Sequence, residues 1–274
     1  MAAQGDKPSD QSNGKSGRSA LAPRRVWIPV ATTVAILVVW QLVVAVGLVP
    51  NFLLPSPTQV VWALGADAAL LASHSATTLV EAALGLAIGT ALGFVFAVLM
   101  DRFEGFRLAF EPLMTVSQTI PTVAIAPLLV LWFGYGLMPK VVLIVLTSFF
   151  PVTVSLVAGF DSVDPDALDL MRTMKATRWQ TFWQVKMPAA MEQFFSGLRI
   201  SATYAIVGAV IAEWLGGFSG LGVYMTRVRK SFSYDKMFAV ILLISVLSLA
   251  LMKLVDALQR AAMPWKQAEG RGSK

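Results

Sequence analysis

The chain has 274 residues, of which 56% are hydrophobic and only 14% are charged. Soluble globular domains carry about 25% charged residues, so this composition excludes an ordinary soluble domain. It predicts an all-α integral membrane protein. The sequence contains no Cys, which excludes disulfides and cysteine-ligated metals. The formal net charge is +6, and the basic residues gather near the ends of apolar segments.

About six apolar windows are long enough to cross a membrane, because a helix needs about 20 apolar residues to span a hydrocarbon core about 30 Å thick. These windows are residues 26–49, 75–100, 112–133, 138–160, 195–217 and 237–258. They are apolar on every side, whereas the strands of a membrane β-barrel alternate in short segments. The sequence therefore predicts one helical transmembrane domain over residues 26–260.

Two tails flank this domain. Residues 1–25 are polar and rich in Gly and Ser, which predicts a disordered segment, and residues 261–274 form the second tail. Lys and Arg near the span ends favour the cytoplasmic side, and both tails and residues 161–194 contain several of them. We therefore expect both termini in the cytoplasm. The basic residues at 227–230 fall outside in this topology and disagree with it.

The third window contains polar residues and two prolines. Pro121 and Pro127 cannot donate backbone hydrogen bonds, so the freed carbonyls must be satisfied within the bundle or along a watery path. We therefore name candidate residues of a translocation path here. They are Ser117, Gln118, Thr119 and Pro121. A kink that serves packing alone explains the prolines equally well.

Few ionisable residues lie at membrane depth. Glu81 and Glu213 are the acids nearest to it, and such residues are costly in lipid. Glu213 joins the candidate path residues, although both acids could instead face water or a partner helix. Lys140 and Lys253 are predicted to be interfacial anchors that extend to the headgroups. The single His74 is predicted to be a polar contact, because a metal site needs several converging ligands.

Three glycines mark a packing face in the second window. Gly85, Gly89 and Gly93 recur every four residues, so they share one side of a helix. Small residues at this spacing let another helix approach closely.

No catalytic or nucleotide site is evident in the sequence. Residues 13–16, NGKS, match the end of a P-loop, but Ser9 stands where the first glycine belongs and no strand precedes it. We therefore expect a non-catalytic chain that binds no cofactor of its own.

The polar segment at residues 164–188 separates two spans, and its residues predict two short helices. Asp164 is a good N-cap, and Pro165 suits the first helical position. Thr177 followed by Gln180 has the spacing of a capping box, so a second helix is expected to begin there. Apolar side chains at 168, 171 and 174 then predict a docking surface in the cytoplasm. The alternative is an amphipathic hairpin on the headgroups.

This segment resembles the cytoplasmic signature of the permease subunits of bacterial binding-protein-dependent ABC importers. The signature is E-A-A-x-x-x-G, nine residues, and then I-x-L-P. Asp169, Leu170 and Met171 take the place of the opening triplet, and Pro188 is the final proline. Lys175 replaces the glycine, so either a left-handed residue there is strained or the bend differs.

Further segments carry the resemblance from about residue 26 onward. They include LPSP at 54–57, APLLVLWFGYG at 126–136, FFP at 149–151, GLRISA at 197–202 and AEWLGGFSGLGVYM at 212–225. They are similar to the branch that imports sulfonates, taurine, nitrate and pyrimidine vitamin precursors. WFGYGLMPK at 132–140 and EWLG at 213–216 resemble permeases for hydroxymethylpyrimidine, a thiamine precursor.

The resemblance implies a type I ABC importer permease fold in the bacterial cytoplasmic (inner) membrane. It implies a homodimer that contacts lipid, two cytoplasmic ATPase subunits that hydrolyse ATP with Mg, and an extracytoplasmic solute-binding protein, with no role for nucleic acid. The ATPase-docking residues that it implies are Asp169, Leu170, Met171, Lys175, Ala176, Thr177 and Pro188 within a docking loop at 161–194.

Two other classes remain as alternatives. A secondary transporter could use helices broken by proline, but it would normally show internal repeats and a buried ion-coupling acid. A membrane enzyme would need clustered His, Asp or Glu at depth. We see neither the repeats nor the cluster in the sequence.

Overall fold

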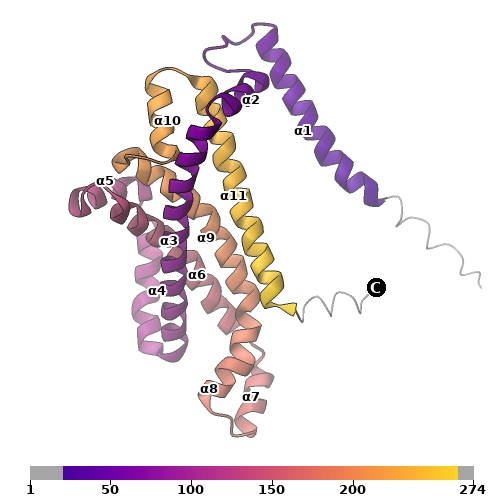
Figure 1. Ribbon diagram of the computed structural model, residues 1–274. Coiled ribbons are helices and arrows are strands. Elements are labelled where there is room, and N and C mark those ends of the chain that lie inside the picture. The colour runs from indigo at the N-terminus through magenta and orange to yellow at the C-terminus, as the bar shows by residue number, and fades with distance from the viewer. Residues whose placement is uncertain (1–20, 265–274) are drawn as a thin grey trace, which may run out of the picture. The chain divides into compact units, whose positions relative to one another are not determined.

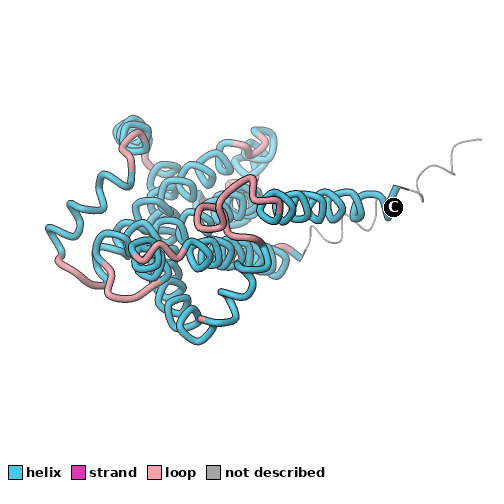
Figure 2. Tube along the Cα trace, turned by 90° about the horizontal axis from the view of Figure 1, so that it is seen from above, coloured by secondary structure: helices cyan, strands magenta, loops and turns pink. Residues whose placement is uncertain are grey.

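The computed structural model describes residues 21–264, and all regular elements in this range are helical (Figures 1 and 2). The helices are α1 (Leu21–Ala45), α2 (Pro57–Ala66), α3 (Ala68–Arg102), α4 (Glu104–Gln118), α5 (Thr122–Phe133), α6 (Leu137–Asp161), α7 (Pro165–Thr173), α8 (Arg178–Thr181), the π-helix η1 (Phe182–Lys186), α9 (Met187–Gly216), α10 (Leu221–Lys230) and α11 (Tyr234–Ala262). The chain divides after Gln59 into two compact units. The all-α fold expected from the sequence is confirmed.

The first unit contains α1, a helix with apolar side chains all round. Trp27, Ile28 and Val39 are more than half exposed, as expected for a helix whose surroundings are lipid. The hydroxyl groups of Thr32 and Thr33 donate to the carbonyls four residues earlier, so these polar groups are satisfied within the helix. Residues 27–45 are long and apolar enough to cross a membrane.

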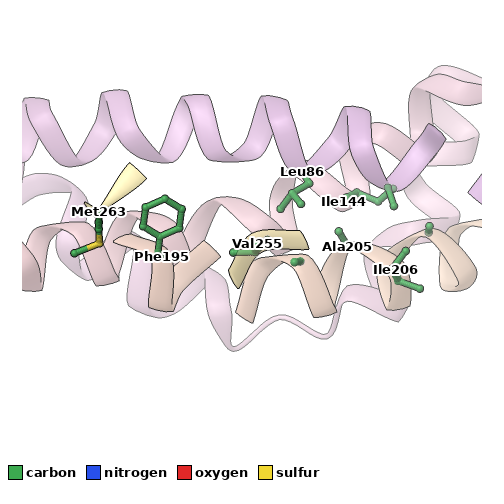
Figure 3. Packing of buried hydrophobic residues seen from close by; sticks show 10 residues of the cluster. Leu86, Ile144, Phe195, Ala205, Ile206, Val255 and Met263 are labelled. Atoms are coloured by element: carbon green, nitrogen blue, oxygen red, sulfur yellow. The ribbon is translucent and has the colours of Figure 1, made fainter. Parts of the chain in front are cut away.

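The second unit is a bundle in which α6 packs along both α3 and α9, and α11 packs on α9. Figure 1 shows α10 at one end of this bundle and the α7–α8 hairpin at the other. A buried cluster at the centre includes Leu86 of α3, Ile144 of α6, Phe195 and Ile206 of α9, and Val255 of α11 (Figure 3). Contact between these helices therefore depends on a shared apolar core rather than on local sequence.

The glycine face of α3 lies against α6, as the spacing predicted. A Cβ atom at Gly85 would overlap the side chain of Ile144. At Gly89 it would lie 3.0 Å from Ser148, and at Gly93 3.0 Å from the Phe149 carbonyl oxygen. The small residues thus allow the two backbones to approach closely.

The third predicted span is not one continuous helix. α4 and α5 are separated by a short break and bent by 99° relative to each other. Pro121 caps α5 at this break, where its ring cannot continue the preceding helix. Pro127 lies inside α5 without ending it. Within residues 21–264, five helices can cross a membrane alone, and the bent pair gives a sixth candidate.

The other boundaries differ from the predictions at several ends. α1 begins at Leu21, inside the predicted N-terminal tail, and α3 begins at Ala68 rather than at residue 75. α9 begins at Met187, so residues 187–194 of the predicted docking loop are the first turns of this helix. α11 ends at Ala262. The rest of the predicted tails, residues 1–20 and 265–274, lies outside the described residues.

Candidate functional site: an exposed hairpin and a buried polar cluster

The first helix of the hairpin, α7, begins as the sequence predicted. The Asp164 side chain accepts a hydrogen bond of 2.9 Å from the backbone N–H of Asp166. Pro165 occupies the first helical position, where its missing N–H is not needed. Asp164 is therefore confirmed as the N-cap.

The end of α7 explains the departure at Lys175. The N–H of Ala176 donates to the Met171 carbonyl and that of Lys175 to the Arg172 carbonyl, each at 2.9 Å. These two bonds form a Schellman motif, which needs a left-handed residue at its fifth position. Lys175 takes that conformation with φ 54°. The strained alternative is thus the one observed, and a non-glycine residue there costs about 1 kcal/mol.

The second helix, α8, starts with the predicted capping box. The N–H of Gln180 donates to the Thr177 hydroxyl at 3.3 Å, and the N–H of Thr177 donates to the Gln180 side chain at 2.8 Å. After one turn the helix widens into the π-helix η1 and continues as α9. The hairpin is consequently joined to the bundle by one uninterrupted helical segment, residues 178–216.

Side-chain contacts hold the hairpin to the bundle. Phe182 packs on Phe160 of α6 with ring centroids 5.5 Å apart, beside a buried cluster formed by α3, α6 and α9. The Lys186 ammonium lies 2.6 Å from the Asp101 carboxylate of α3. Movement of the hairpin would therefore carry the bundle helices with it.

The residues implied as docking contacts mostly face outward. Leu170 is 60% exposed, although it is apolar and lies in a polar segment. Met171 and Ala176 are half-buried, whereas Asp169, Lys175, Thr177 and Pro188 are exposed. Large apolar side chains that remain exposed in this way are typical of a surface that a partner covers.

The candidate path residues do not form one group. Gln118, Thr119 and Pro121 are exposed at the break between α4 and α5, and Ser117 is half-buried beside them. Glu213 is only 1% exposed, and both its carboxylate oxygens accept hydrogen bonds from α3 and α10. In this conformation it presents no surface to a solute.

Glu213 belongs instead to a buried polar cluster. The Thr78 hydroxyl donates to one carboxylate oxygen at 2.7 Å, and the N–H of Gly222 donates to the other at 2.6 Å. Thr78 also accepts from the N–H of Leu221, and the Nδ1 atom of His74 accepts from the N–H of Gly220. These bonds fix the start of α10 against α3 and α9.

The prediction that Lys140 anchors at the headgroups is wrong. Lys140 is 4% exposed, and its ammonium lies 2.5 Å from the Glu81 carboxylate and 3.4 Å from the Ser219 carbonyl. A buried carboxylate in α3 offers it a better partner than a distant headgroup. Lys253, predicted for the same role, is exposed.

The turn before α10 requires glycine. Gly220 has φ +121° and ψ 165°, a conformation open essentially to glycine alone. A Cβ atom there would also overlap the Glu213 carboxylate. The turn and the acid therefore fit each other only without a side chain at position 220.

A smaller polar group fixes the start of α3. Asp67 accepts a hydrogen bond of 2.5 Å from the Tyr224 hydroxyl and lies 2.7 Å from the Lys236 ammonium. Hydrogen bonding from Lys236 and then from Tyr224 holds the pKa of Asp67 below its ordinary value. Burial, with the hydrogen bond to Asp67, raises the pKa of Tyr224.

Sequence reasoning missed most of these polar partners, although a signal was present. His74, Thr78 and Glu81 recur at four and three residues, and Gly85 follows four residues later. That spacing places all of them on one face of α3. A polar stripe that continues a glycine stripe indicates that both face the same packed helices.

Comparison with known proteins decides the class. Residues 89–264 match the family described as the inner membrane component of binding-protein-dependent transport systems. The chain belongs to this family.

Curated relatives of the permease match along most of its length. A probable ABC transporter permease of Haemophilus influenzae is 38% identical over 85% of this chain and 95% of the relative. The formylaminopyrimidine transport permease ThiX of Halalkalibacterium halodurans is 35% identical over 85% and 94%. The taurine transport permease TauC of Escherichia coli is 30% identical over 88% and 90%. The protein is thus an ABC importer permease subunit of the bacterial inner membrane.

A solved structure supports the fold. An amino acid ABC transporter matches with a TM-score of 0.60 and 20% identity, over 72% of this chain and 96% of that chain. The arrangement of the bundle is therefore that of an ABC transporter permease.

Proposed function

We propose that two copies of this permease form a solute pathway and that each copy receives one cytoplasmic ATPase on its α7–α8 hairpin. An extracytoplasmic binding protein would deliver the solute, and the partner ATPase would hydrolyse ATP with Mg. The observation that carries the docking assignment is the exposed Leu170 on a short, firmly capped helix. The continuous helix from α8 into α9 supports a coupling role, because it would transmit movement as a rigid element.

We assign part of the solute pathway to the break between α4 and α5, where it would be lined by Ser117, Gln118, Thr119 and Pro121. Polar groups and a helix end at membrane depth are tolerated where they line a cavity or lie within protein. Glu213 was the fifth candidate, and its hydrogen bonds favour a role in holding α10. The place of Glu213 on the translocation path stays a prediction.

The solute that we favour is a pyrimidine precursor of thiamine, which the relative named for formylaminopyrimidine transport supports. Taurine, an aliphatic sulfonate or nitrate is the alternative, and the likeness to a taurine permease is of similar extent. Uptake into proteoliposomes that contain permease, ATPase and binding protein would compare hydroxymethylpyrimidine and formylaminopyrimidine with taurine. Preferential taurine uptake would overturn the pyrimidine assignment.

A test of the docking assignment is to place a charge on the exposed apolar surface. Leu170→Asp should abolish solute-stimulated ATP hydrolysis by the reconstituted complex, because a carboxylate cannot replace an apolar contact. Gln184→Asp adds the same charge at an exposed position of η1, directly after the hairpin, and should leave hydrolysis close to normal. Unchanged coupling in Leu170→Asp would show that the ATPase docks elsewhere. Uptake that persists without ATP would instead favour a secondary transporter.

The orientation in the membrane is also a proposal, with both termini and the hairpin in the cytoplasm. Because the chain has no native cysteine, single cysteines report sidedness directly. Cysteines at Leu170 and Phe218, both exposed, should react with a membrane-impermeant reagent from opposite sides. Reaction of both from one side would contradict this topology.

A further inference from the structure

A pocket of about 760 Å³ lies between the last turn of α3 and the α7–α8 hairpin. Its wall includes Arg102 of α3, Arg178 and Trp179 of α8, and Phe182 and Lys186 of η1. These residues are far apart in the sequence, and the folding of the hairpin onto α3 brings them together.

Two of the basic groups in this pocket have no anionic partner. Lys186 is neutralised by Asp101 at 2.6 Å, and Arg172, which also lines the pocket, pairs with Asp169 at 2.8 Å. Within residues 21–264, no carboxylate lies within ion-pairing distance of Arg102 or Arg178. Arg102 contacts the face of Phe103, with its guanidinium carbon 5.5 Å from the ring centroid. The pocket therefore holds two unneutralised guanidinium groups.

The depth of the pocket is fixed by the spans that reach it. Arg102 is the last residue of the candidate span Ala68–Arg102, and Arg178 is the first residue of the span Arg178–Gly216. The apolar run of α3 ends at Met100, so Arg102 lies where apolar helix gives way to the polar boundary of the membrane, and Arg178 lines the same pocket. Trp179, which is 68% exposed, and Phe182 line the same pocket, and Trp side chains favour this boundary.

We propose that this pocket binds the phosphate of an anionic phospholipid headgroup. A guanidinium can donate two parallel hydrogen bonds to phosphate oxygens, so Arg102 and Arg178 could hold one phosphate from two sides. Trp179 and Phe182 would contact the apolar part of the same lipid. The bound lipid would join α3 to the hairpin, beside the surface that we assign to the ATPase. The proposal rests on the membrane placement of α3 and α9 and not on the identity of the solute.

Native mass spectrometry of the full-length permease tests this directly. The protein would be released from nanodiscs of phosphatidylcholine alone or of phosphatidylcholine mixed with phosphatidylglycerol. We expect a retained phosphatidylglycerol in the second case. In the double variant Arg102→Gln with Arg178→Gln, apparent affinity should fall about thirtyfold, since each basic group near a membrane surface contributes about a factor of five.

A charge-matched control separates a specific site from general attraction. Arg229→Gln with Lys230→Gln removes the same charge from exposed positions of α10, at the other end of the bundle, and should leave lipid retention unchanged. Equal loss in both double variants, or no loss in either, would overturn the proposal. The pair Arg102→Lys with Arg178→Lys keeps the charge and should retain part of the affinity, which guards against a folding defect in the glutamine variant.

A last experiment tests whether the pocket binds a lipid headgroup or a free anion. Inorganic phosphate would be added to the permease in phosphatidylcholine nanodiscs, and its effect on the thermal unfolding temperature compared with that of phosphatidylglycerol. We expect stabilisation by the lipid alone. Stabilisation by inorganic phosphate with none by the lipid would overturn the assignment to a headgroup. Loss of the retained lipid when the ATPase binds would also overturn it, because the partner would then occupy the pocket.

Discussion

The α7–α8 hairpin and the buried polar cluster at the start of α10 are both polar regions of an apolar bundle, yet they are built differently. The hairpin is exposed, and its caps join residues two or three positions apart. The cluster is buried, and three of its four bonds join residues 135 to 146 positions apart. Local chemistry therefore determines the shape of the hairpin, whereas the cluster exists only in the assembled bundle. Changes in the cluster should accordingly cost more stability than changes in the hairpin.

The largest effect is expected from breaking the buried ion pair. Lys140→Met leaves the Glu81 carboxylate buried without its counter-ion, which costs about 3 to 5 kcal/mol. Unfolding of the purified permease in denaturant would measure the loss. Lys253→Met, at an exposed position, should change stability by less than about 0.5 kcal/mol. Adding Glu81→Gln to Lys140→Met should recover much of the loss, and failure to recover it would show that the charge was not the cause.

The turn before α10 is the next most sensitive position. Gly220→Ala forces a side chain into a glycine conformation and against the Glu213 carboxylate, so we expect a loss of about 2 to 3 kcal/mol in unfolding free energy. Gly105→Ala is the matched control, because a Cβ atom there meets open space within a helix. It should be neutral or slightly stabilising. Equal effects at both positions would contradict the close fit of Gly220 and Glu213.

Removing the N-cap of α8 should cost less unfolding free energy than the two changes above. Thr177→Ala removes the hydroxyl that accepts from the Gln180 N–H, at a cost of about 1 kcal/mol. Hydrogen exchange of the amides in residues 178–186 should become about fivefold faster, and the buried cluster should be unaffected. Thr115→Ala removes an exposed hydroxyl that only bonds back within its helix, so it should leave exchange in the hairpin unchanged.

Lys175→Gly should act in the opposite direction. Glycine adopts the left-handed conformation without strain, so the hairpin should gain about 0.5 to 1 kcal/mol, seen as slower hydrogen exchange after α7. Lys175→Ala keeps the strain and should not show this gain. Loss of ATPase coupling in Lys175→Gly, with stability intact, would show that the lysine side chain makes a specific contact with the partner.

A small pH effect is expected at the start of α3. The pKa of Asp67 is lowered by Lys236 and Tyr224, so its contribution to stability is fully present above the unfolded pKa of about 4. It is lost as the pH falls through the lower pKa of the folded state. Asp67→Asn should therefore flatten the acid side of a plot of unfolding temperature against pH. Glu104→Gln, an exposed acid on α4, should leave that slope in place.

The difference between the two regions also explains what the sequence could predict. The caps of the hairpin join residues that are close in the sequence, so the spacing of Asp164, Thr177 and Gln180 predicted them. The sequence also indicated a left-handed conformation at Lys175 as one of two alternatives. Gly85, Gly89 and Gly93 similarly predicted a close helix contact, because helical spacing defines a face. The spacing did not predict that α6 is the helix that packs against this face of α3.

The buried cluster could not be predicted because its partners meet only through the tertiary fold. Lys140 lies near the end of a predicted span, which suggested a side chain that extends to the headgroups. No residue near it in the sequence indicates that it pairs with Glu81 of another helix. The bend of 99° between α4 and α5 could not be predicted from the sequence either. Pro121 predicted a disruption, but the direction of the chain after it depends on packing against α6 and α9.

The most direct test of the account is a site-specific cross-link between the hairpin and the partner ATPase. Leu170→Cys gives a single cysteine in a chain that has none, and Gln184→Cys provides an exposed control in η1, directly after the hairpin. In the assembled transporter, a short thiol-directed cross-linker should join Leu170→Cys to the ATPase and leave Gln184→Cys free. Cross-linking of Gln184→Cys alone, or of neither variant in an active complex, would contradict the assignment of α7 as the docking helix.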